Sequence, residues 1–387
     1  MSTIPDRAAS PQSAEPAEPA ETTDHLLQDT HLPGSSATRT VKQMAETYWI
    51  LALSCAALIF DGYDIVVYGT IVSRLLKDPS QLGSLNAAQA GTIGSYALIG
   101  VMIGALAAGA VGDHIGRRKI VLGSIAWFSI GMALTAVSMN FTYFGAMRLL
   151  TGIGLGALLA TLGAVVAEFA PIDKKNLFNA LVYSGIPAGG VLASIIALVA
   201  LPIVGWRGLF WIGALPLVIL LPFAWKKIPE SPKWLEAKGR HEEAQRVAER
   251  TGVALDGAPA RSSSATGSTG SIESAPVAPQ AVERVGFRGL FTGSYLVPTI
   301  LLGFMSFSGL LLTYGLNTWL PRIMESYGFN ATYSLTFLLL LNTGPIIGGL
   351  VIAALAGPTA TAATAFYVFA GVAVFGALVC ALVPKHD

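Results

Sequence analysis

Long apolar runs that contain almost no charged residues dominate this sequence, as in residues 88–111 and 295–321. A helix needs roughly 20 apolar residues to span the hydrocarbon core of a bilayer, and in lipid its backbone must satisfy its own hydrogen bonds. The chain is 53% hydrophobic and only 12% charged, so a soluble domain could not cover these runs. They are continuous and lack the ten-residue alternation of a transmembrane barrel. We therefore predict an all-α integral membrane protein.

The runs predict about nine spanning helices, arranged as six and then three. They lie near residues 48–76, 88–111, 119–139, 142–167, 177–203, 206–227, 295–321, 334–356 and 362–383. The first six form a half over residues 46–228, and the last three form a half over 293–387. Residues 229–292 between them are polar, with a charged segment predicted to be helical over 233–250 and then a Ser-, Gly-, Ala- and Pro-rich linker. Residues 1–45 have the composition of a disordered tail.

Basic residues in the short loops predict the orientation of these helices. One side carries His114, Arg117, Arg118, Lys119, Lys174, Lys175, Lys226, Lys227 and Lys233. The other side carries mainly Arg74, Lys77, Arg207 and Arg322. Because cytoplasmic loops are enriched in Lys and Arg, the N-terminal tail and the central loop are predicted to be cytoplasmic.

Composition and motifs argue against several other classes of protein. A net charge of +1 without a basic, aromatic-interleaved stripe gives no indication of nucleic acid binding. The two cysteines, Cys55 and Cys380, both lie in apolar runs and supply neither a disulfide framework nor a metal site. No nucleophile constellation or nucleotide loop is present in the sequence, so we expect no enzymatic activity and no cofactor. The expected surroundings are the lipid bilayer, and a monomer is the default oligomeric state.

Two carboxylates, Asp61 and Asp64, lie midway along the first predicted span. Ionised groups at this depth are costly and usually face a cavity or a partner on an ion or proton path. A spacing of three places both on nearly the same helix face, where double ionisation is disfavoured. The pair is therefore predicted to carry a proton, with Gly62 removing bulk between the two groups. The alternative is that one of them is a packing contact near the interface.

A second polar cluster occupies the predicted turn between spans two and three. It consists of Gly112, Asp113, His114, Ile115, Gly116, Arg117, Arg118 and Lys119. An ordinary positive-inside loop would explain the basic residues but not an acid between two glycines. Asp113 is expected to pair with Arg117, with Arg118 or with the positive end of a neighbouring helix, as a latch that opens in another conformation.

The fourth span combines a cation, a glycine string and an acid. Gly152, Gly154 and Gly156 have no preceding strand to support a phosphate loop, and close helix packing explains them better. Arg148 either snorkels to the interface or faces inward, towards an anionic substrate or a carboxylate. Glu168 belongs either to the cytoplasmic charge network or to a solvated helix end.

Polar residues in or near the spans are candidates for lining a cavity that suits an aromatic ring. They are Tyr63, Tyr68, Tyr96, Tyr183, Tyr314, Asn317 and Asn342. For the aromatic members, positions in the interfacial belt are the alternative.

Together these clusters resemble the major facilitator superfamily, and within it the aromatic acid and proton symporter family. The acidic pair is similar to the first-helix signature of that family, within a run, 60–70, that looks closest to benzoate transporters, as does 176–180. Residues 112–119 resemble the superfamily motif between helices two and three, 148–156 its fourth-helix motif, and 229–235 the segment after helix six.

The resemblance implies alternating access by two helical halves, importing a proton with a small aromatic carboxylate such as benzoate or a hydroxybenzoate. It implies a role in proton coupling for Asp61 and Asp64, in gating for Asp113, Gly116 and Arg117, and in the supporting charge network for Arg148 and Glu168.

The second half departs from the family pattern of twelve spans. Residues 326–384 contain no charged residue and no His, and about three spans are missing. A basic residue for the substrate carboxylate therefore has no counterpart there. The alternatives are transport of another organic acid, or a shortened protein that binds aromatic acids without transporting them or is inactive.

Overall fold

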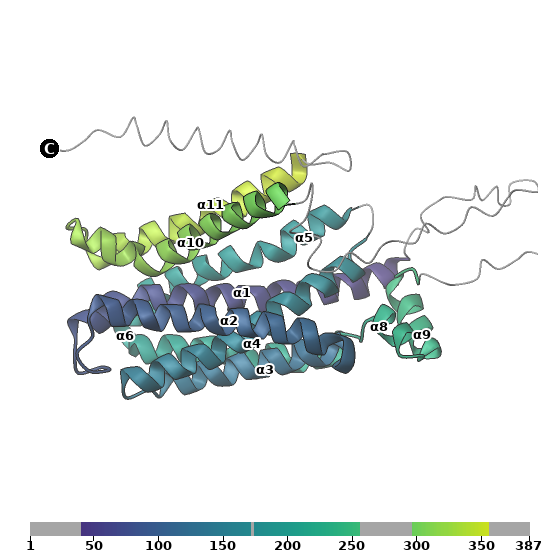
Figure 1. The fold of residues 1–387 in the computed structure, drawn as a ribbon, viewed down its shortest axis with the longest axis horizontal. Helices are drawn as coiled ribbons and strands as arrows, with labels where there is room; N and C mark the ends of the chain where they lie inside the picture. Colours follow the sequence, from purple (N-terminus) through teal and green to yellow (C-terminus); the bar gives the residue numbers. More distant parts are fainter. Residues whose placement is uncertain (1–39, 172–173, 256–295, 356–387) are drawn as a thin grey trace, which may run out of the picture. The chain divides into compact units, whose positions relative to one another are not determined.

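The computed structural model describes residues 40–171, 174–255 and 296–355, and within these ranges the chain is helical, without a strand (Figure 1). The elements are α1 (Val41–Lys77), α2 (Ala87–Ile115), α3 (Arg117–Ala136), α4 (Phe141–Phe169), α5 (Lys175–Tyr183), α6 (Gly185–Gly213), η2 (Leu215–Leu217), α7 (Leu220–Lys227), α8 (Pro232–Ala237), α9 (His241–Thr251), α10 (Leu296–Ser326) and α11 (Ala331–Leu355). The predicted all-α fold class is confirmed. The tail up to residue 39, the linker after 255 and the ninth predicted span lie outside the described residues.

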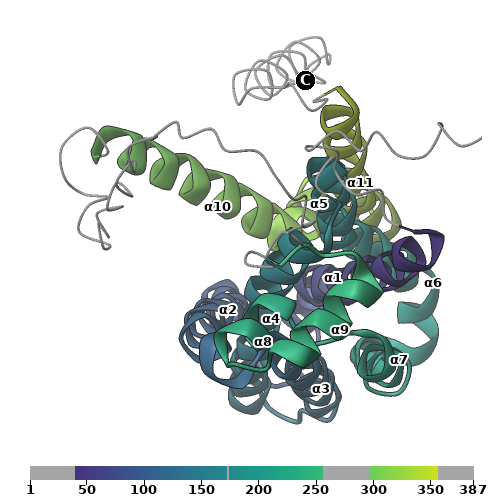
Figure 2. The ribbon, with the colours of Figure 1, turned by 90° about the vertical axis from the view of Figure 1, so that its right-hand side faces the viewer.

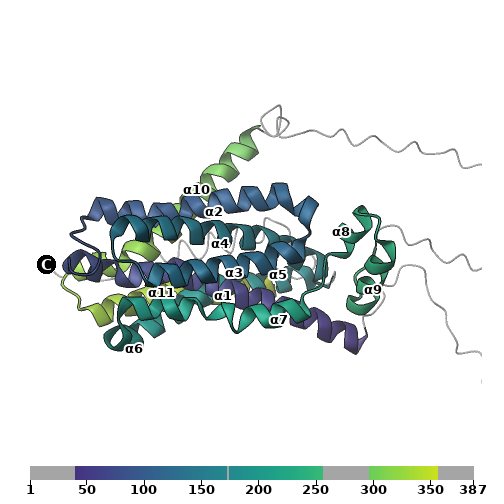
Figure 3. The ribbon, with the colours of Figure 1, turned by 90° about the horizontal axis from the view of Figure 1, so that it is seen from below.

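Seven stretches of the described chain are long and apolar enough to cross a membrane. One of them, Lys175–Lys227, covers 53 residues and contains two of the predicted spans. Within it Gly205 adopts φ 65° and ψ −178°, outside the helical region, at the boundary predicted between residues 203 and 206. The chain turns back there, so that α5 and α7 lie at the same end of the bundle (Figure 3). Eight predicted spans thus have helical counterparts, and the total of nine stays a prediction.

The first helix begins earlier than predicted. The tail was expected to reach residue 45, whereas α1 starts at Val41. The Thr40 hydroxyl accepts a hydrogen bond from the backbone N–H of Gln43 at 3.4 Å, and the Gln43 side chain accepts one from the Thr40 N–H at 2.8 Å. This reciprocal capping box satisfies two backbone donors that a helix start otherwise leaves without partners. The Thr-x-x-Gln spacing was the sequence signal for this start.

The charged segment after α7 is two helices, where the sequence predicted one over 233–250. Between α8 and α9, Gly239 adopts φ 73°, and the Arg240 N–H donates to the Leu235 carbonyl at 2.9 Å. This is the hydrogen bond of a glycine-terminated helix end, which a residue with a Cβ adopts only with strain. The two helices lie together at one end of the bundle, facing the viewer in Figure 2.

Glycines bring α2 and α4 into direct backbone contact. A Cβ at Gly152 or Gly156 would overlap the carbonyl oxygens of Ala97 or Val101 on α2, and one at Gly104 would overlap that of Ile153 on α4. Without a hydrophobic driving force between helices in lipid, such close packing is a main source of association. The glycine string of the fourth span therefore packs helices, as predicted.

α1 connects the two halves of the described chain. It packs along α6 and also contacts α10, while α11 packs against α6. At Gly69 a Cβ would overlap the Asn317 carbonyl oxygen of α10, and at Gly190 it would overlap the Asn342 side chain of α11. Near one end of the bundle the Lys77 ammonium of α1 pairs with the Glu325 carboxylate of α10 at 2.6 Å.

Alanine at two glycines of α2 tests this packing. Gly104→Ala must displace the α4 backbone, and overpacking of this kind costs about 1–3 kcal/mol. We expect a lower thermal unfolding temperature in detergent. Gly109→Ala is the matched control, because a Cβ there meets open space. Equal unfolding temperatures for the two variants would contradict the glycine contact between α2 and α4.

Candidate functional site

A buried ion pair joins the first and fourth helices. Arg148 of α4 donates through Nη1 to the Asp64 carboxylate of α1 at 2.5 Å, and through Nη2 to the Asp64 backbone carbonyl at 3.3 Å. The side chains are only 3% and 2% exposed. Of the two orientations open to Arg148 on sequence grounds, the structure has the inward one, directed at a carboxylate.

Aromatic rings surround the guanidinium group of Arg148. Its Cζ lies 5.6 Å from the ring centroid of Tyr68 and 5.9 Å from that of Phe210. Ring faces at these distances attract a cation, and more strongly where water is excluded. The Nε of Arg148 is buried and has no hydrogen-bond partner among the described residues. One donor of the cation is therefore unused.

Asp61 is buried close to this pair, and its carboxylate makes no hydrogen bond within the described part of the chain. Asp61 is only 3% exposed. The carboxylate is near enough to that of Asp64 and to the Tyr314 hydroxyl of α10 to interact electrostatically with both. An unpaired anion at such depth is costly. The two predicted acids thus differ, because Asp64 is neutralised by Arg148 and Asp61 is not.

Gly62 lies between the two acids and admits a neighbouring helix. A Cβ at Gly62 would overlap the backbone carbonyl of Ile186 in α6. The sequence predicts that Gly62 removes bulk between the two carboxylates. In the structure, the α6 backbone occupies the space beside Gly62. Asp61 and Asp64 are consequently held at a close junction of α1 and α6.

Two of the predicted cavity-lining tyrosines, Tyr63 and Tyr68, have other surroundings. Tyr63 and Tyr68 are fully buried, and their hydroxyls donate to the backbone carbonyls of Leu209 at 2.8 Å and Ala90 at 2.7 Å. A buried hydroxyl needs such a partner, so these two residues are packed parts of the core. Tyr96 and Tyr183 are 38% and 36% exposed, and the Tyr183 hydroxyl lies beside Gly163 of α4. Tyr63 and Tyr68 therefore do not line a cavity, although Tyr68 still contacts Arg148, and the cavity-lining role of Tyr96 and Tyr183 stays a prediction.

Asn317 and Asn342 form one unit between α10 and α11. The Asn342 amide donates to the Asn317 side-chain oxygen at 2.7 Å and to the Leu338 carbonyl at 2.9 Å. Both residues are at most 5% exposed. They sit where Gly69 and Gly190 allow close approach, so the pair positions the second half against the first. The sequence shows each of them as a polar residue in an apolar run but does not indicate that they pair.

At the end of the bundle that carries α8 and α9, the Glu168 carboxylate binds several hydrogen-bond donors. Its carboxylate pairs with Arg117 of α3, accepts from the Ser231 hydroxyl at 2.7 and 2.8 Å, and accepts from the Lys233 backbone N–H at 3.1 Å. The Glu168 side chain is only 3% exposed. We name Arg117, Glu168 and Ser231 the loop-end latch. The sequence identified Arg117 and Glu168 but missed Ser231, whose signal was its position before a helix-starting Pro232.

Asp113 does not form the side-chain pair expected of it. It is exposed, and in the described residues its contact across helices is the backbone carbonyl, which accepts from the Trp234 indole at 3.0 Å. Arg117 turns instead to Glu168, while the Arg118 backbone N–H donates to Glu230 at 3.0 Å. The reason lies in the turn, because α2 ends at Ile115 and leaves Asp113 on its outer face.

The glycines of this turn also have different roles. Gly116 adopts φ 99° between α2 and α3, and a Cβ there would overlap the Glu230 carboxylate. It is therefore required both by the backbone and by the approach of Glu230. Gly112 has ordinary helical surroundings, with only the Ile120 side chain near the position of a Cβ.

Comparisons with known proteins identify the family. The profile of the Major Facilitator Superfamily matches residues 49–386. The gentisate transporter of Corynebacterium glutamicum is 33% identical over 341 residues, covering 85% of this chain and 67% of the relative. The benzoate transport protein of Acinetobacter baylyi is 33% identical over 309 residues, with 78% and 63% covered. The chain belongs to the major facilitator superfamily.

Further matches agree with this assignment. The 4-hydroxybenzoate transporter PcaK of Pseudomonas aeruginosa is 29% identical over 281 residues, covering 72% of this chain and 60% of the relative. The solved structure of the proton:xylose symporter XylE bound to 6-bromo-6-deoxy-D-glucose superposes with a TM-score of 0.62 at 19% identity, covering 82% of this chain and 70% of that one, and shows the shared fold.

The expected relationship to aromatic acid transporters is thus confirmed, and these relatives are transporters and not enzymes. The chain is a multi-pass membrane protein of this superfamily. It spans about two thirds of the length of the curated relatives that it matches.

Removing one or both members of the buried pair tests its energetics. Arg148→Leu leaves the Asp64 carboxylate buried and uncompensated, which we expect to lower stability by about 3–5 kcal/mol. The double variant Asp64→Leu and Arg148→Leu removes both charges and should be more stable than Arg148→Leu alone. Unfolding of the purified variants in detergent measures this, and simple additivity of the two single changes would contradict the ion pair.

Glu168→Ala tests the loop-end latch. It removes the acceptor shared by Arg117, Ser231 and the Lys233 N–H, so we expect faster amide hydrogen exchange over residues 229–238. Mass spectrometry of the exchanged peptides measures this. Glu242→Ala is the control, since its contact with Arg246 is a 3.8 Å pair between exposed side chains and contributes little. Exchange that is unchanged by Glu168→Ala would show that the latch does not hold α8.

Proposed function

We propose that this protein is a proton-coupled secondary transporter that imports an aromatic carboxylate, such as benzoate or a hydroxybenzoate, by alternating access. The observation that carries the proposal is the buried triad of Asp61, Asp64 and Arg148. It combines an unpaired acid, a neutralised acid and a cation with one unused donor, deep in a helix bundle. The names of the relatives support an aromatic acid as the solute.

The triad suggests how proton and substrate are coupled. Arg148 can neutralise one carboxylate fully, either that of Asp64 or that of the substrate. Protonation of Asp64 would release Arg148 for the substrate carboxylate, and its aromatic neighbours Tyr68 and Phe210 would face the substrate ring. Asp61, next to this exchange, would take up the transported proton first and pass it to Asp64. The missing basic residue in residues 326–384 is then not required, because the first half supplies the cation.

Two contacts are suited to alternate during the cycle. The loop-end latch closes one end of the first half, and the pair of Lys77 with Glu325 joins the two halves near the opposite end. In our proposal the Lys77–Glu325 pair opens when the site faces outwards, while the first half rocks against the second. The basic end is proposed to face the cytoplasm of a bacterial-type inner membrane, with the N-terminus inside and the monomer as the working unit.

Uptake of labelled benzoate by proteoliposomes under an inward proton gradient tests the function. We expect accumulation by the wild-type protein and its loss in Asp61→Asn and Asp64→Asn, because neither amide can carry a proton. Asp61→Asn should retain exchange of labelled for unlabelled benzoate, which needs no net proton movement. Accumulation that persists in both variants would refute the proton role.

Asp78→Asn is the matched control for these variants. Asp78 follows the end of α1 and is partly exposed, and hydrogen bonds from Ser80 and Gln81 lower the pKa of its carboxyl below its ordinary value. It therefore stays ionised between about pH 5 and 8 and should leave the pH profile of uptake unchanged.

Competition by gentisate, hydroxybenzoates and protocatechuate ranks the substrates. Because the chain spans about two thirds of its relatives, binding without uptake is the alternative outcome. Saturable benzoate binding with no accumulation in proteoliposomes would select a binding protein over a transporter.

A further inference from the structure

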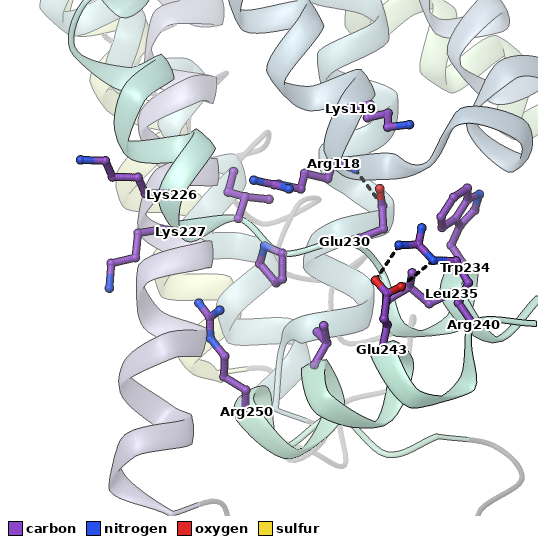
Figure 4. Close-up of a pocket in the computed structure, with 13 residues that line it drawn as sticks. Arg118, Lys119, Lys226, Lys227, Glu230, Trp234, Leu235, Arg240, Glu243 and Arg250 are labelled. Carbon is purple, nitrogen blue, oxygen red and sulfur yellow. Dashed lines mark hydrogen bonds and ion pairs between the residues drawn. The ribbon is translucent and has the colours of Figure 1, made fainter. Parts of the chain in front are cut away.

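A pocket at the loop end of the bundle carries an excess of positive charge (Figure 4). Its walls come from the start of α3, the end of α7, the segment before α8, and α8 and α9. The cationic side chains that line it are Arg118, Lys119, Lys226, Lys227, Arg240 and Arg250. The acidic side chains that line it are Glu230 and Glu243. The proposed transport mechanism uses none of these cations.

Two of the cations are already neutralised. Arg240 forms a two-pronged ion pair with Glu243, at 2.6 and 2.9 Å, and Arg250 pairs with Glu46 of α1 at 2.9 Å. One carboxylate oxygen of Glu230 accepts hydrogen bonds from the backbone N–H groups of Arg118 and Ser231, at 3.0 and 3.1 Å.

Four cations remain without a carboxylate partner among the described residues, namely Arg118, Lys119, Lys226 and Lys227. Arg118 donates through Nη2 to the Trp225 carbonyl at 2.6 Å, while its Nε is buried without any hydrogen-bond partner in the described chain. Like charges gathered in one pocket repel one another, and a bound anion would relieve both the repulsion and the unused donor.

The position of the pocket indicates where such an anion comes from. Trp225 is 63% exposed next to Arg118, whose Cζ lies 6.0 Å from its ring, and Trp49 is 49% exposed with the Lys227 ammonium 5.7 Å from its ring. Exposed tryptophans at the ends of spanning helices mark the headgroup level of a bilayer. Basic pockets at that level on the cytoplasmic side suit the headgroups of anionic lipids.

We propose that this pocket binds the phosphate group of an anionic membrane lipid. The phosphate would bind beside Arg118, which supplies directed donors. Lys119, Lys226 and Lys227 lie at the rim with their side chains turned outwards (Figure 4), and they would supply point charges around it. The apolar side chains of Ile228, Pro229 and Leu235, which also line the pocket, would meet the uncharged part of the headgroup. Because α3, α7, α8 and α9 all contribute to the walls, the lipid would join the helix bundle to the segment that the loop-end latch holds.

Binding of phosphatidylglycerol to the full-length purified protein tests the proposal, with phosphatidylcholine as the uncharged comparison. Native mass spectrometry after addition of each lipid measures retention. We expect preferential retention of phosphatidylglycerol and a loss of affinity of about fivefold for each pocket cation replaced, so about 25-fold for Arg118→Gln with Lys226→Gln. The charge-preserving pair Arg118→Lys and Lys226→Arg should retain most of the binding and shows that the pocket tolerates substitution.

Lys174→Gln with Lys175→Gln is the matched control, because these lysines are exposed at the start of α5 and do not line the pocket. If this pair weakens phosphatidylglycerol binding as much as the pocket pair does, the attraction belongs to the whole basic surface and the site is refuted. Equal retention of the two lipids by the wild-type protein would also refute it. A parallel titration with inorganic phosphate distinguishes the source, since binding of phosphate but not of phosphatidylglycerol would overturn the lipid assignment.

Discussion

The buried contact between Arg148 and Asp64 is the interaction on which the arrangement of the first half depends. Each charge is expensive to hold away from water, and each is tolerated because the other is 2.5 Å away. That requirement fixes the rotation of α1 and of α4 about their axes. It thereby places Asp61, three residues before Asp64, at the junction with α6. A helix bundle held by small-residue packing alone would have no comparable constraint on register.

Glycines make this electrostatic arrangement possible, because they let backbones come close enough for short side chains to meet. Gly62 brings the α6 backbone against the acids, Gly104 and Gly156 bring α2 against α4, and Gly69 brings α10 against α1. In lipid, where apolar area gains little from contact with another helix, such approach is a principal source of stability. The charged residues and the close glycine contacts alternate along α1, so the same helix positions both the charges and its neighbouring helices.

Sequence reasoning predicted the helices well and the partners of polar side chains poorly, for a physical reason. Spanning helices follow from the length of apolar runs, and Gly205 falls where a boundary was predicted. The partner of a polar side chain depends on how its helix is rotated about its own axis. An apolar run says little about this rotation, because both its lipid-facing and its protein-facing sides are apolar. Thus Tyr63 and Tyr68 were placed in a cavity but donate to backbone carbonyls, and Asp113 was placed in a latch that Glu168 forms. The burial of Asp61 and Asp64 was predictable because the cost of a charge in an apolar run does not depend on the partner.

The described part of the second half contributes few ionisable groups. A transporter needs a site for its solute, a way to couple the proton, and contacts that differ between conformations. In this chain the ionisable groups that could serve the first two needs lie on α1 and α4, whereas the described second half contributes uncharged polar groups, namely Tyr314 and the pair of Asn317 with Asn342. Its one ion pair with the first half, between Glu325 and Lys77, lies at the end of α10. In the proposed cycle the second half would therefore act mainly as a surface against which the first half moves, a role that depends on fit and less on charged side chains.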